Sequence, residues 1–201
     1  MKRVSVLLLA TCLFAVMQSC NSNSSSDSVD QADSTNNARD TTSMSATQQD
    51  TTTHMGVNDD VADFAVKAAN AGMTEVQLGE FASKNATDKS VKDFGKMMVK
   101  DHTKAGDELK SIATSKNIAL PAQPGQDMTE MMTDLMKKTG KDFDKAYMNQ
   151  MVKDHKDAVD LFQKESNDSK DSTMKTFAAN TLPTLQKHLT AAEAIVKSHN
   201  Y

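Results

Sequence analysis

The sequence has no tryptophan and little cysteine, proline or glycine: two, three and seven residues in a chain of 201. Cys12 lies within an apolar stretch at the start of the chain, and Cys20 stands four residues after the end of that stretch. The remaining chain therefore has no cysteine with which to build a disulfide framework or a thiolate site for metal or catalysis. It also has no glycine-rich phosphate loop, nucleophile elbow or zinc-protease helix motif.

Long apolar runs are absent except at the start. Lys2 and Arg3 precede the apolar stretch Val4–Val16, which is too short for a permanent membrane span. The ending Met17-Gln18-Ser19-Cys20 resembles a bacterial lipoprotein signal, in which the cysteine carries the lipid. We therefore predict a signal peptide over residues 1–20, lipid attachment at Cys20, and a periplasmic protein anchored to the outer membrane. Ordinary secretion, with cleavage nearby, is the alternative.

Large apolar side chains are also nearly absent from residues 21–58, which are rich in Ser, Thr, Asn, Gln and Asp. Such a composition predicts a disordered polar tether. The folded domain is then residues 59–201, the size of one domain. Its acidic and basic residues are interleaved and the net charge of the chain is −4, so we expect no nucleic-acid partner.

Within residues 59–201, apolar residues recur at helical spacing in four stretches and no strand pattern is present. The stripes begin at Val61, Val91, Phe143 and Met174. They predict an all-α fold, an antiparallel four-helix bundle. The connection 117–140 contains a further short helix, Asp127–Lys138, and is long enough for a ferritin-like crossover or for an up-down-up-down bundle.

One polar residue interrupts each stripe where an apolar residue is expected. These residues are Glu75, His102, His155 and His188. Two of them end an exact repeat, because Met98–His102 and Met151–His155 both read Met-Val-Lys-Asp-His. A repeated helical unit usually packs against its copy, so we expect His102 to face His155, with all four residues converging in mid-bundle.

A carboxylate and three imidazoles form a sound ligand set for one divalent ion, such as zinc, iron, manganese or copper. Asp101 and Asp154 are alternative ligands or outer partners, and Met98 and Met151 would join if the ion were copper. A buried hydrogen-bonded network without metal is the competing interpretation.

A di-iron oxidase site needs a glutamate three residues before a histidine on each of two helices. Val99, Val152 and Leu185 stand at those positions, so di-iron oxidase chemistry is disfavoured. We identify no catalytic residue.

Several short motifs together resemble the bacterial envelope family called domain of unknown function 4142. They are Glu75-Val76-Gln77-Leu78-Gly79, Met98 to Lys104, Phe143-Asp144 with Tyr147, and Leu182-Pro183 with His188-Leu189. The resemblance implies an exported ferritin-like bundle without established activity, with recurring polar positions at Glu75, Asp101, His102, His155 and His188. Two functions remain open: metal or ligand binding in envelope stress or metal handling, and a structural or interaction module.

Overall fold

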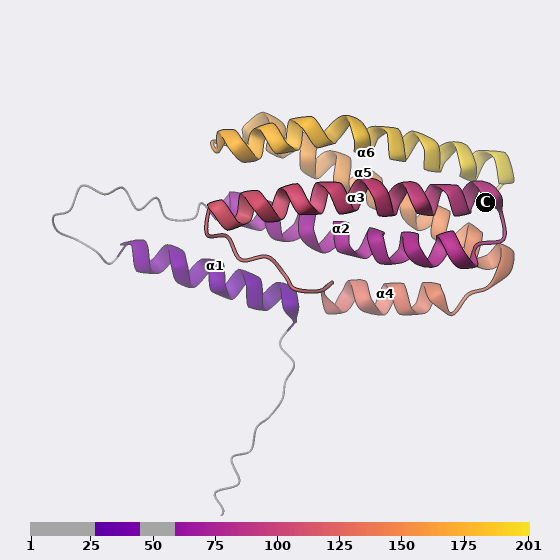
Figure 1. Ribbon diagram of the computed structural model, residues 1–201, viewed down its shortest axis with the longest axis horizontal. Helices are drawn as coiled ribbons and strands as arrows, with labels where there is room; N and C mark the ends of the chain where they lie inside the picture. Colours follow the sequence, from indigo (N-terminus) through magenta and orange to yellow (C-terminus); the bar gives the residue numbers. More distant parts are fainter. Residues whose placement is uncertain (1–26, 45–58) are drawn as a thin grey trace, which may run out of the picture.

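The computed structural model describes residues 27–44 and 59–201, and these form six α-helices without a strand (Figure 1). The all-α prediction is confirmed for this part of the chain. The predicted signal peptide, Cys20, and the tether segments 21–26 and 45–58 lie outside the described residues. None of the described helices is both long enough and apolar enough to cross a membrane.

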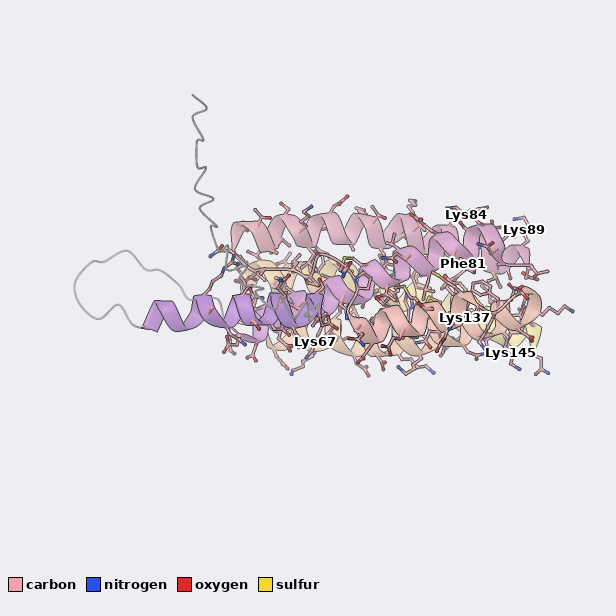
Figure 2. The ribbon with its side chains drawn as sticks, turned by 90° about the horizontal axis from the view of Figure 1, so that it is seen from below. Lys67, Phe81, Lys84, Lys89, Lys137 and Lys145 are labelled. Atoms are coloured by element: carbon pink, nitrogen blue, oxygen red, sulfur yellow. The ribbon has the colours of Figure 1, made fainter. Side chains whose placement is uncertain are left out.

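Four long helices pack side by side as two hairpins: α2 (Asp59–Asn85) with α3 (Lys89–Ser115), and α5 (Gly140–Asp168) with α6 (Ser172–His199). Across the hairpins, α3 packs on α6 and α2 packs on α5. In Figure 1, α3 and α5 run in one direction and α2 and α6 in the other, so neighbouring helices are antiparallel. Exposed lysines such as Lys89 and Lys145 point outward from the molecule (Figure 2).

The connection from α3 to α5 returns along the outside of the long helices (Figure 1). It contains α4 (Gln126–Met136), close to the short helix expected at Asp127–Lys138. Because the connection runs along the molecule instead of closing one end, α5 starts at the end where α3 also starts. The two copies of the Met-Val-Lys-Asp-His repeat therefore lie on parallel helices.

Aspartate side chains fix the starts of the helices that follow the short turns. Asp88 accepts a hydrogen bond from Ser90 N at 2.7 Å and caps α3, and Asp171 caps α6 by accepting from Met174 N at 2.8 Å. Such caps satisfy backbone donors that have no partner within the helix. The fully buried Asp144 of α5 accepts from the backbone N–H groups of Thr87 and Asp88, which ties the α2–α3 turn to α5.

The apolar core consists of two clusters, one toward each end of the long helices. One cluster is built around Phe64, Phe162 and Phe177, and the other around Phe94 and Tyr147. On every long helix, the polar residue that interrupts the stripe falls between the residues of the two clusters. The buried polar side chains thus form a layer across the middle of the core.

Helices α2 and α3 touch closely at two glycines. A Cβ atom on Gly79 would lie 2.7 Å from the carbonyl oxygen of Gly95, and a Cβ on Gly95 would lie 2.7 Å from that of Gly79. Only glycine allows the two backbones to approach so closely. This contact fixes the hairpin just beyond the polar layer.

The tether prediction is wrong for Ser28–Met44, which form helix α1 packed beside α2. Apolar burial does not explain this helix, since its sequence lacks an apolar stripe. Hydrogen bonds to the α3–α4 connection hold it: Asn36 accepts from Ala119 N at 2.7 Å and donates to Ala119 O at 3.0 Å. Asp27 accepts from Gln126 N at 2.6 Å. The compositional rule considers only apolar surface and misses such side-chain-to-backbone contacts.

Candidate functional site

The four polar residues predicted to converge come from four different helices and lie in one buried layer. Glu75 is 3% exposed, His102 is 7% exposed, and His155 and His188 are fully buried. Each belongs to an otherwise apolar stripe, so helix packing carries each side chain inward. Burial of so many ionisable groups is costly unless they are paired or bind an ion.

The three imidazole rings contact one another. Their centroids are 5.5 Å apart for His102 and His155, 5.3 Å for His102 and His188, and 5.3 Å for His155 and His188. One nitrogen from each ring lies within 4.8 Å of the other two. The facing of His102 and His155 that the repeat predicts is present in the structure.

An oxygen acceptor holds one nitrogen of each ring. Nδ1 of His102 donates to Glu75 Oε2 at 3.0 Å, and Nε2 of His188 donates to Asp101 Oδ2 at 3.0 Å. Nδ1 of His155 donates to the backbone carbonyl of Met151 at 2.9 Å and lies 3.4 Å from Glu75 Oε1. These acceptors fix both the orientation and the tautomer of the rings.

The tautomers follow from the acceptors, because a nitrogen that faces a carbonyl or carboxylate oxygen must carry the hydrogen. When all three rings are neutral, the unprotonated nitrogens are Nε2 of His102, Nε2 of His155 and Nδ1 of His188. The last two are 3.3 Å apart. Two lone pairs at that distance repel each other unless a proton or a metal ion lies between the rings.

Two polar atoms of this layer have no hydrogen-bond partner among the described residues: Nε2 of His102 and Oε1 of Glu75. The hydroxyl of Tyr147, one helix turn from Met151, also has no hydrogen-bond partner among the described residues. Buried polar atoms of a native protein are nearly always hydrogen-bonded. Several unpaired buried atoms in one layer therefore indicate a candidate ligand-binding site.

Burial and mutual interaction shift the pKa values of these groups in different directions. Burial would raise the pKa of Glu75, but the three imidazoles around it lower that pKa to about 2. Burial would lower the pKa of His102, yet the Glu75 carboxylate raises it overall. Burial lowers the pKa of His155, and lowers that of His188 to about 4 despite Asp101. Near neutral pH the layer thus contains an ionised Glu75 and two neutral imidazoles ready to act as ligands.

The structure assigns different surroundings to the other predicted residues. The Glu75 carboxylate contacts Nδ1 of His102 and Nδ1 of His155, whereas the unprotonated nitrogen of each of these rings is Nε2. Asp154 accepts a hydrogen bond from Gln150 at 2.8 Å, and burial raises its pKa to about 6. Met98 and Met151 are fully buried in the neighbouring apolar cluster.

Three contributors were not among the predicted site residues. The backbone carbonyl of Met151 orients His155, the Asp144 side chain fixes the α2–α3 turn, and the Tyr147 phenol lies near the layer. The Glu75 charge adds to burial in raising the pKa of Tyr147. Asp144 and Tyr147 had a usable signal, since both belong to a motif with Phe143, which Asp144 follows directly and Tyr147 follows by one helix turn. The backbone carbonyl of Met151 had no signal in the sequence, because every residue type carries a backbone carbonyl.

A family model, Domain of unknown function (DUF4142), matches residues 44–195. The chain belongs to the DUF4142 family. This membership confirms the resemblance in the short motifs. No curated protein matches the chain.

A solved structure, a DUF305 fragment from Deinococcus radiodurans, is similar to this DUF4142 domain. The two align with a TM-score of 0.62 and 9% sequence identity, over 70% of this chain and 97% of the other. At that identity the likeness shows a shared fold and nothing about activity.

Proposed function

We propose that this DUF4142 protein binds one divalent transition-metal ion through His102, His155 and His188, in metal handling at the bacterial envelope. The observation that carries the proposal is the mutual contact of three imidazoles, each of which has one nitrogen held by an oxygen acceptor. Metal-ligating histidines almost always donate their second N–H in this way.

The charge distribution supports a cation. A metal ion among the three unprotonated nitrogens would remove the lone-pair conflict between His155 and His188. It would also replace the extra proton that Glu75 favours on His102, because metal and proton compete for the same nitrogen. The carboxylates of Glu75 and Asp101 would offset the charge of the ion from outside the ligand shell.

The donor set defines the class of ion. Three neutral imidazoles suit zinc, copper and iron, and a three-histidine site leaves a fourth position open. In this proposal Glu75 orients His102 and His155 and is not itself a ligand, unlike the arrangement expected from the sequence. Met98 and Met151 belong to the apolar packing unless the ion is copper(I), for which a thioether is a suitable ligand.

The setting of the site is part of the proposal. The residues before the described part of the chain have the pattern of a lipoprotein signal with Cys20 as the lipidated residue. The order of helix directions and the long α3–α5 connection support classing the domain as a ferritin-like four-helix bundle (Figure 1). A lipid-anchored metal-binding bundle combines these features.

Metal analysis tests the proposal directly. The chain, made without a histidine tag and stripped with a chelator, is dialysed against Zn²⁺, and bound zinc is measured per chain. We expect one equivalent for the wild type and also for His199→Ala, since His199 pairs with Asp88 at a distant site. Zinc well below one equivalent in the wild type would refute the proposal.

A second function has one observation in its favour. The 3.3 Å separation of His155 Nε2 and His188 Nδ1 also fits a shared proton, as in a purely structural network that fixes the packing of the helices. In that case zinc, iron and copper ions would all leave the melting temperature unchanged, whereas a specific ligand of the folded state raises it.

A further inference from the structure

A groove between α2 and α3 leads from the surface to the buried polar layer. Its volume is about 730 Å³, within the range usual for small-molecule sites. The lining is mainly apolar, and part of it comes from the opposite hairpin: Phe162 of α5, and Phe177 and Leu185 of α6. The groove therefore passes between the two helices of one hairpin and reaches the core.

Small residues keep the groove open. Ala68, Ala69 and Gly72 line it on α2, and Ala105 and Gly106 line it on α3. A Cβ atom added to Gly72 or Gly106 would meet no other atom within 4 Å. Beyond the polar layer, Gly79 and Gly95 bring the same two helices into direct contact. The space between α2 and α3 is therefore open on one side of the layer and closed on the other.

The outer wall of the groove is held in place. Ile118, Leu120 and Pro121 of the α3–α4 connection line this side. The backbone of the same connection is fixed by α1, through the two hydrogen bonds between Asn36 and Ala119. The groove is consequently a formed feature of the fold and needs no rearrangement to exist.

Two buried polar side chains belong to the lining of the groove. Glu75 and His102 both line it, and each is more than nine-tenths buried at 3% and 7% exposure. Oε1 of Glu75 and Nε2 of His102 have no hydrogen-bond partner among the described residues. An apolar groove whose lining includes these two polar residues fits a molecule with an apolar body and one polar head.

We propose that this groove binds an elongated aliphatic molecule with a neutral hydroxyl head, and that the head lies at Glu75 and His102. The hydrogen of a hydroxyl can be donated to Glu75 Oε1 or to the unprotonated Nε2 of His102, and both are atoms without a hydrogen-bond partner among the described residues. A carboxylate head would be repelled by the buried carboxylate of Glu75. The head and the proposed ion would use the same nitrogen of His102, so the inference applies to the metal-free protein.

Titration with 1-octanol tests the proposal on chelator-stripped full-length protein, followed by NMR shifts or calorimetry. Saturable binding is expected for the wild type. Gly72→Leu and Gly106→Leu, which place a side chain in the groove, should each weaken binding by about tenfold or more, since losing contact with two methylenes costs roughly that much. The control is Ala194→Leu, which adds the same apolar side chain at an exposed position of α6 and should bind like the wild type.

Folding of the variants is checked independently by circular dichroism and thermal melting. Replacing a helical glycine with leucine favours the helix, so both groove variants should melt no lower than the wild type. The proposal is overturned if octanol does not saturate, or if the groove variants bind as tightly as Ala194→Leu. Octanoate binding as tightly as 1-octanol would overturn the assignment of a neutral hydroxyl head.

Discussion

The sequence Met-Val-Lys-Asp-His occurs on α3 as Met98–His102 and on α5 as Met151–His155, and the two copies have different neighbours. In both, the methionine and histidine are buried and the lysine is exposed. The aspartates differ: Asp101 accepts from His188, whereas Asp154 accepts from Gln150 of its own helix. Helical spacing thus decides which side chains point inward, and the surrounding helices decide what each one does.

The largest expected effect concerns the histidines, the part in which the two copies agree. His102→Ala and His155→Ala should each lower zinc affinity by more than about 100-fold, beyond the 10–100-fold typical of losing an outer partner. The measurement is competition with a chromophoric zinc chelator. If only one of the two variants loses affinity, the copies do not share a site.

Substitution of the two aspartates should change zinc affinity by different amounts in the two copies of the repeat. Asp101→Asn should weaken zinc binding by about 10- to 100-fold, because it removes the charge that orients and polarises His188. Asp154→Asn should change zinc affinity by less than about threefold, since Asp154 bonds to Gln150 and not to a ligand. The same competition assay applies, and equal losses in the two variants would contradict the distinction.

Asp154 should instead affect stability, in a pH-dependent manner. Burial raises its pKa from 3.8 to about 6, so the folded protein holds this proton more tightly than the unfolded chain does. Ionisation therefore lowers the free energy of unfolding as the pH rises from about 4 to about 6. Asp154→Asn should stabilise the metal-free protein by about 1 kcal/mol near pH 7, after allowance for solvent screening, and by nothing near pH 3.5.

Urea denaturation at the two pH values measures this difference. Asp101→Asn is the matched control, because its carboxylate is bonded to His188 and its removal should give no stabilisation near neutral pH. A gain for Asp154→Asn of the same size at both pH values would show that the effect is not electrostatic.

The smallest effect is expected from the methionines. Met98→Leu and Met151→Leu conserve volume, so both should fold, and zinc affinity should stay within about threefold of the wild type. A selective loss of copper(I) affinity in either variant, with zinc affinity unchanged, would identify a thioether ligand and copper as the ion.

The helices and the members of the polar layer were predictable because both follow from spacing along one chain. A histidine in place of an apolar residue, at the same depth on several helices, is visible without coordinates. Helix α1 was not predictable in this way, since it is held by hydrogen bonds such as those between Asn36 and Ala119, far apart in sequence.

The partners of each histidine were also beyond the sequence. Asp101 and Asp154 have identical flanking residues, and only the position of α6 makes one of them the partner of His188. For the same reason Glu75 was expected among the ligands, whereas its carboxylate faces the outer nitrogens of His102 and His155. Spacing gives the depth of a side chain but not the direction of its polar atoms.

X-ray absorption at the zinc edge of the zinc-loaded chain tests the central claim most directly. The three-histidine site predicts imidazole scattering from three nitrogens at about 2.0 Å, with one further light ligand. A shell of oxygen atoms with fewer than two imidazoles would contradict it, because the ion would then be bound elsewhere on the protein.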